Sequence, residues 1–204
     1  DHNTTGVRNV AVGMNALTAN TTGGDNVSVG YGALYTNTTA SDNTAVGKTA
    51  LYYTTTGAYN TGLGRGAMEQ NTTGSNNTAV GRIALISNTT GATNTAVGSQ
   101  ALQNNTTASN NTAVGISALY LNTTGSGTAV GYEALVTNTT GGDNVAVGIH
   151  ALRYNTTGSS NTSVGQNSMD ANTTGGANTA IGRHSLTACT TGGNNVAVGY
   201  NAGP

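Results

Sequence analysis

Asn43-Thr44-Ala45-Val46-Gly47 is one copy of a five-residue phrase that returns along the whole chain at a nearly constant interval. The glycine that closes each copy occupies every seventeenth position, apart from a single interval that is shorter by one. These glycines are Gly13, Gly30, Gly47, Gly64, Gly81, Gly98, Gly115, Gly131, Gly148, Gly165, Gly182 and Gly199. Such a period is typical of solenoids, in which each repeat is one supersecondary unit stacked on the next. The 204 residues are therefore expected to form one repeat domain, 1–204, of twelve units without separate caps.

The full unit is Asn-Thr-Thr-Gly-x-x-Asn-Thr-Ala-Val-Gly-x-x-Ala-Leu-x-x, and residues 88–104 are a nearly pure copy of it. Helix is disfavoured because Gly and Thr are frequent and no helical apolar stripe is present. Short β-branched runs bounded by Gly and Asn favour strands and turns. We expect Asn-Thr-Ala-Val-Gly to be one strand, x-Ala-Leu-x a second strand, and Asn-Thr-Thr-Gly a corner whose Gly supplies backbone angles that other residues resist. The predicted fold is all-β: a rod-like parallel β-solenoid (β-roll) of twelve coils, one per repeat, roughly 58 Å long and oligomeric.

Equivalent residues of stacked coils should lie above one another at about 4.8 Å. Ten of the twelve corners begin with Asn, the exceptions being Thr54 and Cys189. Stacked amides can hydrogen-bond along such a rank. The sequence thus predicts a structural ladder of Asn3, Asn20, Asn37, Asn71, Asn88, Asn105, Asn122, Asn138, Asn155 and Asn172.

The strand phrase is restricted on both sides, with a small residue at the Ala position and a branched aliphatic residue at the Val position. A strand restricted on both faces is typical of one buried on both faces. We expect the aliphatic rank that includes Val97 to be packed and to hold the rod together. A coil as short as this repeat has only one interior, so the second face is predicted to meet another chain. The alternative is that small residues permit dense stacking while one face stays in water.

Composition argues against several classes of function. Six Lys and Arg against seven Asp and Glu give a net charge of −1, which offers no field for the phosphates of nucleic acid. No apolar run approaches the ~20 residues of a membrane span. Cys189 is the single cysteine and cannot form an internal disulfide. His150 and His184 lie two coils apart, without metal spacing, and no base has an orienting partner. The sequence indicates no catalytic, cofactor or metal site, and we expect no enzyme.

The variable positions carry all the charged, Tyr and His side chains, apart from the terminal Asp1-His2. The position after the closing glycine holds Tyr31, Lys48, Arg65 and Arg82 in four consecutive units. Stacked cations beside aromatic rings suggest a shallow groove for an anionic glycan or another carboxylate. The alternative is that these long side chains spread into solvent. The aromatic side chains expected beside them are Tyr35, Tyr52 and Tyr53.

The phrase Asn-Thr-Ala-Val-Gly followed by x-x-Ala resembles the head repeats of YadA-type trimeric autotransporter adhesins, and the match covers all twelve units. That resemblance implies a left-handed parallel β-roll in which three chains associate. The full phrase, longer than the usual coil of that family, is also similar to repeats of phage tail-fibre-like and surface proteins.

Together these observations predict a structural or adhesive fibre, or a segment of one, at a cell surface, in the extracellular space or on a virion. Its main partner would be itself, as a homotrimer or as an end-to-end filament in which Pro204 of one copy meets Asp1 of the next, and a cell-surface glycan is a further possible partner. Two alternatives stay open. The Thr rank that begins Thr4, Thr21, Thr38 favours an ice-binding solenoid, and ten Asn-Thr-Thr corners match the N-glycosylation acceptor pattern of a glycan-decorated scaffold.

Overall fold

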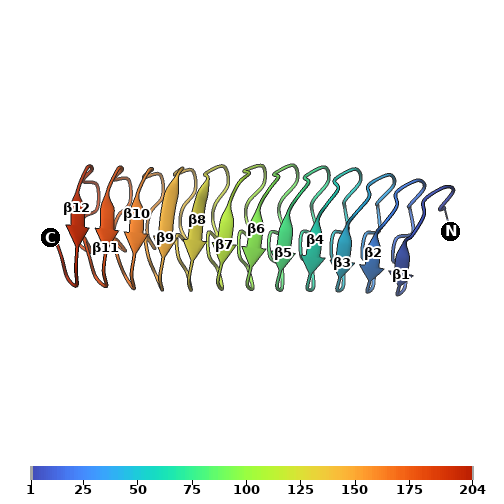
Figure 1. Cartoon of the computed structure of the whole chain (residues 1–204), viewed down its shortest axis with the longest axis horizontal. Helices are drawn as coiled ribbons and strands as arrows, with labels where there is room; N and C mark the ends of the chain where they lie inside the picture. The colour runs from blue at the N-terminus through green and yellow to red at the C-terminus, as the bar shows by residue number, and fades with distance from the viewer. Residues whose placement is uncertain (1, 204) are drawn as a thin grey trace.

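The computed structural model describes residues 2–203 as a rod built on a single sheet (Figure 1). Twelve parallel strands follow one another in chain order, and each pairs with its neighbours in sequence. The predicted parallel β-solenoid is confirmed. Asp1 and Pro204, and with them the predicted junction between copies, lie outside the described residues. The strands are Val10–Val12 (β1), Val27–Val29 (β2), Thr44–Val46 (β3), Thr61–Leu63 (β4), Thr78–Val80 (β5), Thr95–Val97 (β6), Thr112–Val114 (β7), Gly127–Val130 (β8), Asn144–Val147 (β9), Thr162–Val164 (β10), Thr179–Ile181 (β11) and Val196–Val198 (β12).

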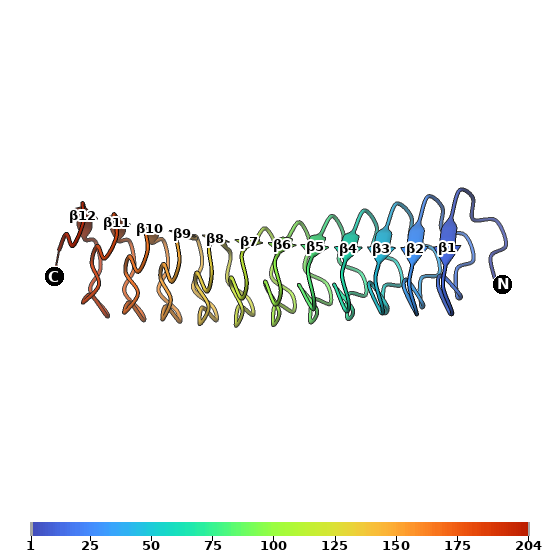
Figure 2. The same ribbon diagram turned by 90° about the horizontal axis from the view of Figure 1, so that it is seen from below.

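Each coil contains one strand, so the prediction of a second strand at x-Ala-Leu-x is wrong. That segment is a turn in which Gln100 has φ 65° and Leu102 has φ 51°. Left-handed backbone at both positions reverses the chain instead of extending it. As a result both Ala101 and Leu102 are fully buried, and the Leu102 amide still donates to the carbonyl of Ala118 in the next coil at 3.0 Å. Figure 2 shows the resulting row of loops beside the sheet.

The strand register places equivalent positions of consecutive repeats beside one another. Thr95 pairs with Thr112, and Ala96 in the same strand is fully buried. Because successive side chains of a strand point to opposite faces, Thr95 and Val97 both point outward. Val97 is only partly buried, and its neighbour Val114 is 36% exposed. The prediction that the valine rank is the packed core of the rod is therefore wrong: within one chain, the core consists of the two alanine ranks and the leucine rank.

Glycine recurs at two positions of the repeat, after the strand and in the corner, for different physical reasons. Gly98 has φ 132°, and a Cβ there would lie 2.5 Å from the carbonyl oxygen of Gly115. The corner residue Gly91 is not among the residues with positive φ, and a Cβ there would overlap the carbonyl oxygen of Ala108. The corner glycine thus permits close stacking of coils. It does not supply an unusual backbone angle, contrary to the prediction.

Asparagine side chains form two parallel rows of hydrogen bonds inside the rod. In the corner row, Asn88 Nδ2 donates to Asn71 Oδ1 and to the carbonyl of Gly91, both at 2.9 Å. In the row that precedes the strands, Asn94 Nδ2 donates to Asn77 Oδ1 at 3.1 Å. The corner row runs in two segments, through residues 3, 20 and 37 and from 71 to 172. These bonds satisfy polar groups that have no access to water.

The corner row is interrupted where Asn is replaced. Thr54 stands where an amide would donate to Asn37, and both Thr54 Oγ1 and Asn37 Oδ1 are buried without a partner. Cys189 has the same effect on Asn172 Oδ1. A buried acceptor without a donor costs about 1–3 kcal/mol. The exceptions to the repeat are therefore local weaknesses of the rod.

The single shortened coil interrupts the second row. Gly127 takes the place of the asparagine and pairs with Asn144, and Asn111 Oδ1 is buried without a partner. The residue missing from this coil is the one before the asparagine position, which has a positive φ in other coils, as in Thr93 with φ 56°. Without it, β8 begins one residue earlier than the strands on its N-terminal side.

Candidate functional site

The outer sheet face is formed by the two outward residues of each strand, at the Thr and Val positions of the repeat. The first is Thr in eight strands and Val in four, and the second is always Val, Leu63 or Ile181. Members of the second rank are exposed to a similar extent in distant coils, with Val46 at 37% and Ile181 at 42%. None of these 24 positions carries a charge, although the chain has 13 charged residues.

This face runs along the whole sheet. Twelve strands at about 4.8 Å give it a length of roughly 53 Å. The largest apolar patch of a typical monomer is about 300–600 Å² and is often functional. A face of roughly 53 Å by about 10 Å, the width of three strand residues, lies within that range before its side-chain relief is included. Its length and its lack of charge make it the first candidate surface.

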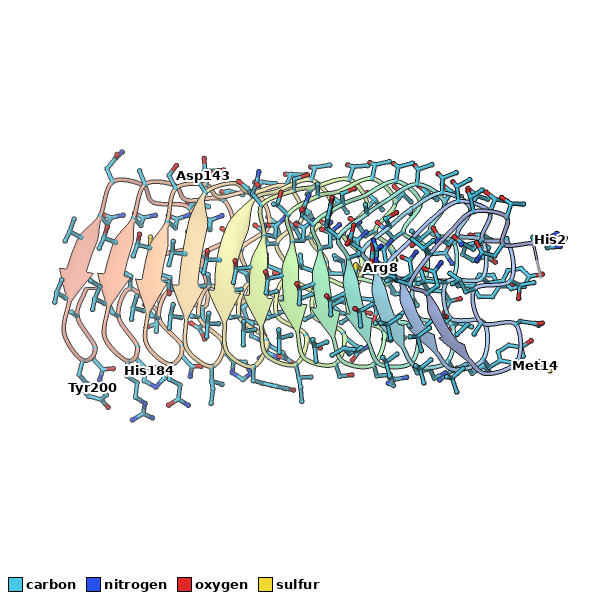
Figure 3. The ribbon with its side chains drawn as sticks, turned by 45° about the vertical axis from the view of Figure 1, so that its right-hand side comes forward. His2, Arg8, Met14, Asp143, His184 and Tyr200 are labelled. Carbon is cyan, nitrogen blue, oxygen red and sulfur yellow. The ribbon has the colours of Figure 1, made fainter. Side chains whose placement is uncertain are left out.

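The turn edge is the second candidate surface. We call the residues that follow the closing glycines the first-slot rank. Met14 and Tyr200, at opposite ends of this rank, lie along one edge of the rod, whereas Asp143 lies along the other (Figure 3). The predicted residues Tyr31, Lys48, Arg65 and Arg82 belong to this rank and are all exposed.

Lys48, Arg65 and Arg82, in consecutive units of the first-slot rank, lack the acidic partners that Arg8 and Arg153 have. Lys48 Nζ lies 5.7 Å from the centre of the Tyr31 ring, which is cation–π distance. None of Lys48, Arg65 and Arg82 forms an ion pair with any residue between 2 and 203. Three cations without an ion pair therefore stand in consecutive coils of this edge, and the nearby carboxylate of Glu69 accepts a hydrogen bond from Thr49 Oγ1 at 2.8 Å.

The predicted aromatic residues gather beside them. Tyr35 and Tyr52 are stacked with ring centres 4.9 Å apart, and Tyr53 meets Tyr52 edge-on at 4.7 Å. Burial raises the pKa of Tyr52, with a smaller contribution from the neighbouring Tyr35 and Tyr53. A Cβ at Gly32 would lie 2.9 Å from the Tyr52 ring, so that glycine makes room for the stack. Tyr31 and Tyr53 remain 45% and 43% exposed.

Sequence reasoning missed a second polar cluster on this edge. Glu133 Oε2 lies 2.7 Å from Arg153 Nη2 and 3.4 Å from His150 Nε2. A hydrogen bond to the Glu133 carboxylate raises the pKa of Tyr132. The sequence contained an indication of this cluster, because Glu133 and His150 occupy the same position of consecutive units and therefore stack. Here Arg153 is paired with a carboxylate, in contrast to the three cations without an ion pair.

A shallow hollow of about 320 Å³ lies where the short coil meets its neighbour, lined in part by Ser126, Gly127 and Asp143. Ser126 Oγ donates to Asp143 Oδ1 at 3.0 Å. Within residues 2–203, no three His, Cys, Asp or Glu side chains are grouped as a metal site would require. The same part of the chain contains no helix long and apolar enough to cross a membrane.

The geometry of the corner bears on the two alternative functions, the glycan-decorated scaffold and the ice-binding solenoid. Asn88 is fully buried and its Nδ2 is a donor in the corner row, so an attached sugar could not be accommodated in a folded coil. The Thr89 hydroxyl donates to the carbonyl of Thr106 at 3.0 Å. The corner threonines thus stabilise the stacking of coils, and the corner is a structural part of the rod.

A scan against protein-family models gave no match, and neither did searches of curated proteins and of solved structures. The class of protein is therefore defined by the fold alone: the chain is a β-solenoid repeat protein.

Proposed function

We propose that this chain is a structural segment of an extracellular or virion fibre that self-associates sideways through its outer sheet face. The observation that carries the proposal is the run of 24 uncharged outward positions across twelve strands. In this arrangement the turn edge stays in solvent and presents the variable residues for adhesion. The role is mechanical and adhesive, without catalysis.

A second copy of the same chain is the occupant that best fits this face. Both copies would present rows of Val and Thr with the same spacing of about 4.8 Å, so the rows can interdigitate in register over the full length. The strands β2 to β11 are already paired on both sides within the sheet, so sideways association depends on burial of side chains. Branched Val side chains lose little rotamer freedom when they pack. Three copies around a common axis, as the adhesin resemblance implies, would cover all three outer faces.

Charge substitution on the outer face tests this proposal. We expect the wild-type chain to sediment as an oligomer and the double variant Val97→Asp, Val130→Asp to sediment as a folded monomer. The matched control is Ser99→Asp, Gln166→Asp, which adds the same charge to the first-slot rank and should leave the oligomer intact. A wild-type chain that stays a monodisperse monomer over a wide concentration range would overturn the proposal.

Ice binding is a second candidate for the same face. The observation in its favour is that eight strands place Thr outward beside an aliphatic rank, in regular rows. A thermal hysteresis assay separates the two functions. Hysteresis in a monomeric wild-type chain, lost in Thr95→Lys, would favour ice binding, whereas a fibre segment should show none.

A further inference from the structure

We infer that the first-slot rank binds a linear acidic polysaccharide that lies along the rod, with Lys48, Arg65 and Arg82 contacting anionic groups on successive sugars. The inference rests on the proposed function in one respect, namely that the turn edge is the surface left free for recognition. It names the ligand class of that surface.

The first step is the contrast among the six basic residues of the chain. Arg8 forms an ion pair with Asp25, and Arg153 forms one with Glu133. The guanidinium of Arg183, which is the lone cation in its part of the rank, lies 5.8 Å from the ring centre of Tyr200. The remaining three cations are adjacent to one another and have no acidic partner within residues 2–203. Like charges at neighbouring positions repel, and an anionic ligand removes that repulsion.

The second step is the spacing. The sheet fixes the Cα atoms of this rank about 4.8 Å apart along a straight edge. One sugar of an extended polysaccharide advances by a comparable distance. A polymer with one carboxylate per sugar can therefore meet one cation per coil, and each arginine can hold its carboxylate through two parallel hydrogen bonds.

The third step is the aromatic end of the rank. Tyr31 precedes the three cations by one coil and carries Lys48 near its ring. Tyr53, in the same coil as Lys48, is also exposed. An exposed tyrosine offers an apolar face and a polar tip, which suits the C–H face and the hydroxyls of a sugar ring. Aromatic contact at one end would define where the polymer begins to bind.

Nucleic acid fits this surface less well. The chain has a net charge of −1, and within residues 2–203 the three cations are the only basic cluster without an ion pair. Single strands also bind in a positively charged groove that follows their backbone over several nucleotides. Three cations are few for such a groove, and Tyr35 and Tyr52 stack on each other and leave no space for a base between them.

The test compares polygalacturonate, a neutral β-glucan and single-stranded oligothymidylate in affinity electrophoresis and titration calorimetry at low salt. We expect binding of polygalacturonate alone. The triple variant Lys48→Gln, Arg65→Gln, Arg82→Gln should bind polygalacturonate with an affinity lower by about tenfold or more, because these substitutions remove the charge-assisted contacts. Arg183→Gln removes a lone cation of the same rank and is the matched control, which should bind as the wild type does. Raised salt should weaken binding.

Three results would overturn the inference: no binding of polygalacturonate by the wild type, equal binding by the triple variant, or tighter binding of the oligonucleotide. The triple variant is also sedimented. Because its substitutions lie outside the outer sheet face, its oligomeric state tests the fibre proposal separately from the polysaccharide. Its circular dichroism spectrum shows whether the coils are folded.

Discussion

Asn37 Oδ1 is buried without a hydrogen bond because Thr54, in the next coil, has no amide to donate to it. The Thr54 hydroxyl is buried without a partner as well. The pair shows what each rung of the corner row contributes, since Asn88 and Asn71 make the same contact with a bond of 2.9 Å.

Restoring the missing rung should stabilise the rod. We expect Thr54→Asn to raise the free energy of unfolding by about 1–2 kcal/mol, because two unpaired buried groups are replaced by a bonded amide. Hydrogen exchange of residues 37–71 should slow. Thr56→Asn places the same side chain at an exposed position of that corner and should have little effect. Equal stability of the two variants would mean that corner asparagines matter for turn geometry alone.

The inner and outer ranks should respond differently to truncation. Leu102 is fully buried, so Leu102→Ala should cost about 2–5 kcal/mol, as large-to-small changes in cores do. Val97→Ala removes a partly buried outward side chain and should cost the monomer far less. Denaturant unfolding at a concentration where the chain is monomeric gives both values. A larger effect of the valine would contradict the assignment of the core to the leucine rank.

The phenol of Tyr132 should lose its proton at a higher pH than an ordinary tyrosine does. The hydrogen bond to Glu133 raises its pKa and favours the neutral form in the folded chain. The resulting stabilisation is fully present below the unfolded value of about 10 and is lost as pH rises through the higher folded pKa. Tyrosinate absorbance should show this step, which Tyr132→Phe identifies by removing it. Glu133→Gln should move it to lower pH, and an unchanged midpoint would exclude the carboxylate as the cause.

Whole coils should be removable. Deleting residues 88–104 takes out one complete unit and brings Asn105 against Asn71, so every rank stays continuous. We expect a folded rod with an unchanged circular dichroism shape, since each coil contacts only its neighbours. Deleting residues 88–95 places strand residues in the corner position and should unfold the adjacent coils. If both deletions behaved alike, the coils would not be the units of stability.

The period in the sequence was sufficient to predict the solenoid, because ranks of Gly, Asn and Thr can repeat so strictly only when coils stack. Periodicity could not reveal that Leu102 has a left-handed backbone, since a buried turn and a buried strand both show restricted apolar residues. The same restriction led to the wrong burial for Val97. A uniform rank can face inward, or face outward toward something absent from a single chain.

The candidate site was partly predictable for a related reason. Lys48, Arg65 and Arg82 occupy one position of consecutive units, and stacking alone brings them together. The ion pair of Glu133 with Arg153 joins different positions of adjacent coils, and predicting it requires the path of the turn. The loss of the partner of Asn111 likewise became visible only with the strand register at Gly127.

The corner row of asparagines has a direction along the rod. Its amides donate toward the N-terminal neighbour, as Asn105 does to Asn88 and Asn88 does to Asn71. Their dipoles therefore align head to tail, as peptide dipoles do in a helix, and bonds in such chains polarise one another. The positive end of this row points toward the N-terminus. Two rods packed antiparallel would oppose the dipoles of their corner rows, and two packed parallel would add them, so the two directions of packing differ in the electric moment that these rows contribute to the assembled fibre.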